Sequence, residues 1–348
     1  ELLMAIANYQ IPSKLTFYPS YLQYAYAAGL INGVDFNTQN DITEEDIYKM
    51  VILDPSNTTE LSLNNGDFFA YDLKTNNYNF NFGMILGHDF LNENIFTMPY
   101  SFIKNEDGDL IENTSIGGTN IKNYFPSLNG WSAFTLNEIP DDTSSIGFLN
   151  PNNFPAIANS GTINIGSVVI GKSWTAPQNV DLNASVSYDY GFKQKKTIGG
   201  KTISQMNYYK QSKWLLDAWE LSDTKSDTRT EATESRNGLR TWSASWSFLQ
   251  DKYTMNQNNM QNSKGWSVDD SSEYATGADG TSLYNSSDGI DFYTSVIKPT
   301  MGGHLSCIVK ISESNNPDQW AIVRIKKYQI SQKSPKLINV KLTLEEQV

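Results

Sequence analysis

The sequence has very little cysteine and histidine, and this scarcity excludes several kinds of chemistry. One cysteine, Cys307, and two histidines occur among 348 residues. A single thiol cannot form an internal disulfide, and we expect Cys307 to be a small buried apolar residue. His88 and His304 lack the close spacing of zinc ligands, and we expect His304 to lie in a turn. We therefore expect no metal site and no catalysis that depends on histidine or cysteine.

Positive charge and long apolar runs are also scarce. The chain has 26 basic and 38 acidic residues, which gives a formal net charge of −12. Nucleic acids and anionic membranes attract basic proteins, so we expect neither as a partner. No apolar run reaches the roughly 18 residues of a transmembrane helix, and the first residues lack the basic start and apolar core of a signal peptide. We expect no membrane insertion.

Aromatic residues, in contrast, are abundant, and they alternate with polar residues. The clearest example is RTWSASWSFLQ at residues 240–250, where Trp242, Ala244, Trp246 and Phe248 alternate with serines. A period of two places the apolar side chains on one face of a half-buried strand. The same alternation recurs in residues 77–84, 181–190 and 337–346. The sequence therefore predicts a mainly β fold of antiparallel sheets, arranged as two sandwich or barrel domains with few short helices.

The distribution of turn residues suggests how the chain is divided. We expect an N-terminal arm at residues 1–40, a β-sandwich at 41–176 and a second β domain at 177–348. The second domain contains a long polar excursion at about 251–289, after which strands resume at Phe292. Two further features are local: a capping box from Thr43 to Asp46 predicts a short helix, and residues 206–221 are the best other helical candidate.

One segment matches a nucleotide-binding motif by letter only. Residues 166–173, GSVVIGKS, fit the P-loop pattern, yet three of the four middle residues are β-branched and no helical period follows. We interpret this segment as a strand. Residues 83–90, GMILGHDF, show the same arrangement of glycines around an apolar run. We expect the two strands to pair as neighbours, with glycines easing bends or bulges.

Two groups of residues could bind ligands, and each has a structural alternative. Acidic Asp-Gly segments at 105–109 and 287–291 resemble calcium loops but lack the twelve-residue EF-hand spacing, and hairpin turns explain them. Trp131 and Trp174 could stack on a sugar, or they could fill a sandwich core. We expect no catalytic residues and no cofactor.

Several segments also resemble known protein families. ILGHDF (85–90) followed by GWSAFTL (130–136) is similar to discoidin-like, or galactose-binding-like, jelly rolls, although Asp89 and Phe90 replace the usual Asn and Leu. In the second half, a longer series of segments resembles minor tail proteins of marine tailed bacteriophages. This series comprises, in order, IGKSWTAPQNVDLNASVSYDY, KTIGGKTIS, LRTWSASWSFL, SVIKPTMGGHLSCIVKI, NPDQWAIVRI and LINVKLTLEE. Together the two resemblances cover about residues 80–348.

The resemblance implies a structural protein of the virion rather than an enzyme. It implies a jelly-roll-like sandwich at 41–176 and a distal-tail or tail-tip subunit that assembles with itself in a ring and with neighbouring tail proteins. Such a protein would be incorporated into the phage tail in the host cytoplasm. Two alternatives stay open: a host-adhesion module that binds a host surface glycan, and a capsid decoration protein.

Overall fold

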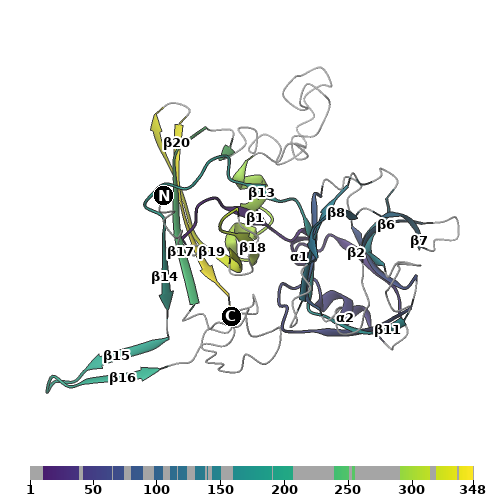
Figure 1. Ribbon diagram of the computed structural model, residues 1–348, viewed down its shortest axis with the longest axis horizontal. Helices are drawn as coiled ribbons and strands as arrows, with labels where there is room; N and C mark the ends of the chain where they lie inside the picture. Colours follow the sequence, from purple (N-terminus) through teal and green to yellow (C-terminus); the bar gives the residue numbers. More distant parts are fainter. Residues whose placement is uncertain are drawn as a thin grey trace, which may run out of the picture.

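The fold is mainly β, as predicted, and its strands pair in antiparallel sheets (Figure 1). The computed structural model describes residues 11–38, 42–64, 66–73, 80–88, 98–104, 110–115, 117–123, 130–137, 139, 143–149, 160–189, 191–206, 239–250, 253–254, 291–313, 319–334 and 337–347. In Figure 1 a long twisted sheet lies on the left and a group of smaller sheets on the right.

The right-hand group contains three sheets and two short helices. Its five-stranded sheet has the order β2 (Ile31–Asn37), β4 (Phe68–Leu73), β10 (Ser145–Leu149), β6 (Met98–Lys104) and β7 (Leu110–Ser115). Its four-stranded sheet has the order β12 (Ser167–Gly171), β5 (Phe82–His88), β9 (Gly130–Leu136) and β8 (Gly117–Asn123). A two-stranded sheet pairs β11 (Ser160–Ile165) with β3 (Thr59–Asn64), and the helices are α1 (Tyr21–Ala27) and α2 (Glu44–Lys49).

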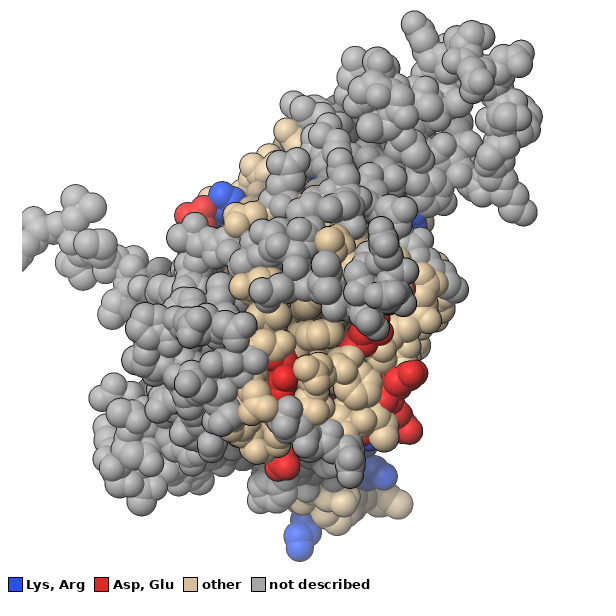
Figure 2. All heavy atoms as spheres, turned by 90° about the vertical axis from the view of Figure 1, so that its right-hand side faces the viewer, with Lys and Arg blue, Asp and Glu red and all other residues tan. Residues whose placement is uncertain are grey.

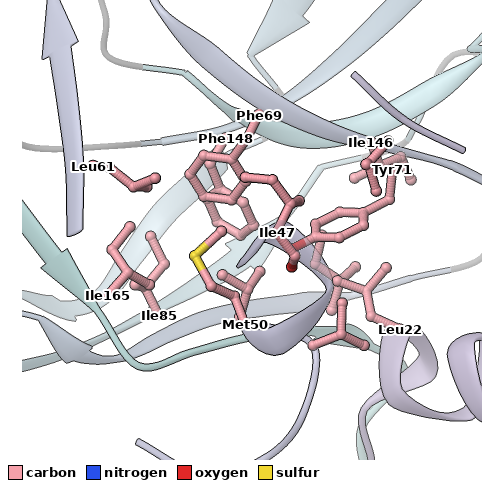
Figure 3. Packing of buried hydrophobic residues seen from close by; sticks show 14 of the residues in the cluster. Leu22, Ile47, Met50, Leu61, Phe69, Tyr71, Ile85, Ile146, Phe148 and Ile165 are labelled. Atoms are coloured by element: carbon pink, nitrogen blue, oxygen red, sulfur yellow. The ribbon is translucent and has the colours of Figure 1, made fainter. Parts of the chain in front are cut away.

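These sheets and helices enclose one apolar core. Figure 3 shows Phe69 and Phe148 stacked beside Met50, with aliphatic side chains of the other elements around them. Tyr71 is buried in the same core, and its hydroxyl donates a 3.2 Å hydrogen bond to the carbonyl oxygen of Ile47 in α2. This bond satisfies the only polar atom of the Tyr71 side chain and ties α2 to the five-stranded sheet.

The left-hand sheet has seven strands and a second core. Its order is β13 (Trp174–Thr175), β1 (Thr16–Tyr18), β18 (Cys307–Lys310), β19 (Trp320–Ser334), β20 (Leu337–Glu346), β17 (Leu239–Gln250) and β14 (Ser185–Asp189). The π-helix η3 (Tyr293–Ile297) and the short 3₁₀ turn η4 (Met301–Gly303) lie against this sheet. A separate two-stranded hairpin is formed by β15 (Phe192–Lys196) and β16 (Thr202–Met206).

A third apolar cluster joins the two groups of sheets. Tyr18 lies in it, with its ring centroid 5.1 Å from that of Phe82 in the four-stranded sheet and 5.1 Å from that of Trp320 in the seven-stranded sheet. Residues 307–309 of β18 and residues 320–323 of β19 are buried on both faces as a result. Every second residue packs into the second core, and Ile308, Trp320 and Ile322 face the third cluster.

The predicted alternation in β17 is confirmed up to Trp246 and then changes. Trp242 and Trp246 are buried in the second core, whereas Phe248 is 61% exposed. The register against β20 shifts between Trp246 and Leu249, and Phe248 adopts a φ of 63°. This bulge moves the burial from Phe248 to Leu249. The expectation that Phe248 faces the core was therefore wrong.

The two glycine-flanked strands pair as predicted. β12 lies antiparallel to β5, with Val169 opposite Met84. Gly87 has a φ of 67°, and the ladder between β5 and β9 shifts register at this residue. A Cβ atom at Gly87 would lie 2.1 Å from the carbonyl oxygen of Pro55, so only glycine fits this bulge.

The helical expectations have mixed outcomes. The capping box is confirmed: the Thr43 side chain accepts from the Asp46 backbone N–H, and the Asp46 carboxylate accepts from the Thr43 N–H.

Residues 293–297, where strands were expected to resume, form η3 instead. The Asp291 carboxylate accepts a 2.8 Å hydrogen bond from the Thr294 N–H at the start of this turn. Residues 207–221 and most of 251–289 lie outside the described residues.

The segment expected to be an N-terminal arm contributes to both groups of sheets. Within residues 11–38, β1 lies between β13 and β18 in the seven-stranded sheet, and β2 forms an edge of the five-stranded sheet. Between them, α1 contacts β12 and buries Leu22 and Ala25 in the first core.

Candidate functional site

The tryptophans proposed for sugar stacking have different positions. Trp174 is 4% exposed and packs in the second core, with its ring centroid 4.9 Å from that of Phe292 and 6.4 Å from that of Trp246. This burial favours the core interpretation of Trp174. Trp131 belongs to β9, but its side chain lies outside the described residues. A stacking role for Trp131 stays a prediction.

The segment with P-loop letters is a strand, as we interpreted it. Residues 167–171 form β12, which is buried along its whole length. A Cβ atom at Gly171 would lie 2.4 Å from the carbonyl oxygen of Pro19, so this glycine serves close packing of two backbones. The segment continues into β13 instead of a helix, and a phosphate cradle requires the helix.

The histidines and the cysteine occupy unrelated places. Cys307 is buried in the second core, and burial raises the pKa of its thiol to about 12. His304 is exposed and follows the η4 turn, as expected. His88 is buried, with Nε2 2.8 Å from the Ser132 hydroxyl, and burial lowers its pKa to about 3. Burial therefore holds His88 in its neutral form at physiological pH.

Neither a metal-binding cluster nor a membrane-spanning helix occurs among the described residues. There, no group of three or more His, Cys, Asp or Glu side chains is placed to hold a metal ion. In the same part of the chain, no helix has both the length and the apolarity needed to cross a bilayer. The two Asp-Gly segments, at 105–109 and 287–290, lie outside the described residues, although β6 and β7 on either side of 105–109 do pair as a hairpin.

The most distinctive surface feature is a hairpin that leaves the body of the molecule, formed by β15 and β16. It extends from the lower end of β14, away from both groups of sheets (Figure 1). Its turn is closed by a 2.8 Å hydrogen bond from the Thr197 N–H to the Lys201 carbonyl oxygen. Residues 193–205 are all exposed. We call residues 191–206 the arm.

The base of the arm is fixed to the seven-stranded sheet. The Asp181 carboxylate accepts hydrogen bonds from the hydroxyls of Ser245 (2.7 Å) and Ser247 (2.9 Å) in β17. At the end of β14, the Asp189 carboxylate accepts a 2.8 Å hydrogen bond from the Gly191 N–H, and Gly191 has a φ of 69°. These contacts hold the segment that precedes the arm and turn the chain into β15. The arm therefore starts from an anchored strand.

The two faces of the arm differ in composition. In the hairpin, Lys195 pairs with Ile203 and Lys193 with Gln205. Paired residues and residues two positions apart share a face, so Lys193, Lys195 and Ile203 lie together, and Lys201 joins them across from Thr197. Ile203 is 55% exposed, and Ile198 in the turn is fully exposed. We call this side of the hairpin the basic face of the arm.

Sequence reasoning missed the arm. The Gly199-Gly200 pair and the KQKK run at 193–196 are visible in the sequence. The pattern does not reveal that residues 193–205 are exposed on both faces of the hairpin, because a short strand with lysines also occurs at the edge of an ordinary sheet. Charge was the available indication, since the arm has four of the 26 basic residues and none of the 38 acidic residues.

Comparison with known proteins adds no identity. No protein-family profile, curated protein sequence or solved structure matches the chain.

Proposed function

We propose that this chain is a structural protein of a tailed phage, a subunit of the tail or tail tip that acts by assembly with itself and with neighbouring tail proteins. The resemblance of the segments between residues 170 and 346 to minor tail proteins suggests this role, and the arm is the observation that carries it. A protein that acts by assembly presents surfaces that a neighbour can cover, and the arm, with residues 193–205 all exposed, offers such a surface.

The arm supports assembly because it is poorly suited to exist alone. An isolated two-stranded hairpin is at best marginally stable in water, and this one leaves Ile198 and Ile203 exposed. Three of its four lysines also gather on one face, where like charges repel. A neighbour that supplies apolar contact and negative charge would remove both penalties. The arm follows β14 of the seven-stranded sheet, and the buried cores of this sheet provide a rigid base for such a contact.

The body of the protein suits a subunit that withstands mechanical force. The third apolar cluster packs the seven-stranded sheet on the four-stranded sheet, and close packing of this kind transmits strain between them. In addition, β19 and β20 pair over ten residues or more, and β20 also pairs with β17. Long antiparallel ladders of this kind resist shear, because many hydrogen bonds break together when strands slide.

Immunogold electron microscopy of source phage particles tests the proposal directly. An antibody raised against this chain should place gold on the tail or its tip. Label over the head would overturn the tail assignment in favour of capsid decoration, and label at fibre ends would overturn it in favour of host adhesion. Particles without any label would overturn the virion assignment itself.

A further inference from the structure

We propose that the basic face of the arm binds a second copy of this chain, at an acidic surface formed by α2 and β3. The inference deepens the proposed function and rests on it for its biological setting. It names the contact between copies: the lysines around Ile203 on one chain and Glu44, Glu45 and Glu60 on the next. We call the last three residues the acidic face.

The charge distribution within the chain points to another copy as the partner. The arm contains four lysines and no acidic residue. Removing these four charges from the net charge of −12 leaves −16 on the rest of the chain. A second copy therefore offers the arm a strongly acidic body, and complementary charge favours and orients such an encounter.

The acidic charge is concentrated in one part of the fold. Residues 31–73 contain nine acidic residues and a single basic one, Lys49. The Lys49 ammonium lies 2.7 Å from an Asp46 carboxylate oxygen, so its charge is already compensated. Figure 2, which looks onto this end of the molecule, shows red acidic groups scattered over the uncharged surface, with blue groups at its margins.

The three members of the acidic face lie on adjacent elements. Glu44 and Glu45 are exposed in the first turn of α2, and Glu60 is exposed on β3. The two elements touch, and the Thr59 hydroxyl donates a 3.4 Å hydrogen bond to the Asp46 carbonyl oxygen. Three carboxylates on neighbouring elements match three lysines on one face of a hairpin in number and in sign.

The positions of the two surfaces determine the type of assembly. In Figure 1 the arm leaves the molecule at the lower left, whereas α2 lies in the right-hand group of sheets. The two surfaces differ from one another and lie on opposite sides of the chain. Contact between them is therefore heterologous, and repetition generates a closed ring or an open filament. An isologous dimer would use the same surface twice and is not what this arrangement favours.

Reversal of charge on each surface, alone and in combination, tests the contact in the full chain. The arm variant is K193E/K195E/K201E, and the face variant is E44K/E45K/E60K. A matched control, R324E/K327E/K341E, makes the same change in net charge as the arm variant at exposed positions of β19 and β20. All substituted side chains are exposed in the chain, so folding should be retained, and circular dichroism and urea midpoints verify this.

Sedimentation velocity provides the readout. At about 50 mM salt, wild type and the control variant should associate with rising concentration, and about 500 mM salt should reverse this. The arm variant and the face variant should each associate at least about tenfold more weakly. A mixture of the two variants should regain association, because the lysine arm of one fits the glutamates of the other and the reversed pair is also complementary. This regained association is the result that a general effect of net charge cannot produce.

Three results would overturn the inference: wild type that stays monomeric at low salt, an arm variant that associates like wild type, or variants that fail to associate when mixed. These failures are distinct from failure of the proposed function. Gold label on the tail together with a monomeric wild type would overturn only the contact. Association through the arm together with particles that show no label would overturn only the tail assignment.

Discussion

The buried ion pair between Arg240 and Glu346 gives the sharpest prediction about stability. Both side chains are 0% exposed. The guanidinium makes two hydrogen bonds to the carboxylate, of 2.9 and 3.2 Å, and a third of 3.1 Å to the Trp320 carbonyl oxygen. The same carboxylate accepts a 3.0 Å hydrogen bond from the Arg240 backbone N–H. The pair joins the start of β17 to the end of β20 and to β19.

Arg240→Met should be strongly destabilising, because it leaves a buried carboxylate without its counter-charge. Loss of one partner of a buried pair costs about 3–5 kcal/mol in the free energy of unfolding. With a denaturant slope of about 2 kcal/mol per molar urea, the midpoint should fall by roughly 2 M. Combining Arg240→Met with Glu346→Leu removes both charges. Stability should then return to within about 2 kcal/mol of wild type, the remainder reflecting the lost contact of the guanidinium with the Trp242 ring.

Urea unfolding followed by tryptophan fluorescence measures these changes. Trp174, Trp242, Trp246 and Trp320 all lie in the seven-stranded sheet, so their emission reports on the sheet that the ion pair holds together. A cost below about 1 kcal/mol for Arg240→Met would refute the reasoning, because that is the magnitude of an exposed pair. A double variant as unstable as the sum of the two single variants would refute it as well, since the penalty would then not come from an unpaired charge.

Three further perturbations test other parts of the fold. Gly87→Ala should lower the free energy of unfolding in urea by at least about 2 kcal/mol, because it combines a clash with a backbone carbonyl and a positive φ. Gly200 has a φ of 82° and open space around it, so Gly200→Ala should cost only about 1 kcal/mol. Equal costs for the two variants would contradict this account. Hydrogen bonds from Lys49 and from the helix cap hold the pKa of Asp46 at about 2, below the ordinary 3.8. The contribution of this carboxylate to stability is therefore present above about pH 4 and is lost as the pH falls through about 2. The difference in urea midpoint between wild type and Asp46→Asn should disappear over the same pH range. Cys307 should resist a thiol reagent in the native state and react fully in denaturant, and rapid native labelling would show that its site is open.

The sequence predicted those parts of the fold in which local pattern and tertiary packing agree. Trp242 and Trp246 alternate with serines and are buried, because one face of β17 covers the second core. Thr43 and Asp46 form their capping box because a helix N-terminus is stabilised by its own neighbours in sequence. Pairing of β5 with β12 was also predicted, from the similar glycine pattern of the two segments.

Other features depend on partners that are distant in the sequence. Phe248 is exposed because the ladder with β20 shifts at that point, and residues 240–250 contain no mark of this shift. Residues 293–297 have strand-like composition, yet Asp291 caps a helical turn there and Val296 packs into the second core. β-Branched residues can adopt either a strand or a helical conformation when burial of their side chains stabilises it. Tertiary packing therefore overrode local preference at both places.

The arm illustrates the same limit for function. Its lysines were visible in the sequence, but composition alone predicts only that an acidic chain avoids nucleic acids and anionic membranes. The structure adds position: three of the four lysines share a face, Ile203 lies among them, and nothing covers that face within the described chain. The small positive charge of the arm is therefore localised on one face of the hairpin, and it points in one direction from the body of the protein.

The energetics of the proposed contact explain why it should be selective but weak. Full burial of Ile203 and Ile198 would contribute about 1.5–3 kcal/mol each, which alone does not offset the entropy lost when two chains associate. The exposed charge pairs add little affinity individually, yet they determine orientation, because any other approach of two bodies with a net charge of −12 is repulsive. A single contact should therefore form and break readily in free solution. In a closed ring every copy makes the contact twice, so that removal of one subunit requires both to break, and weak contacts then give a stable assembly.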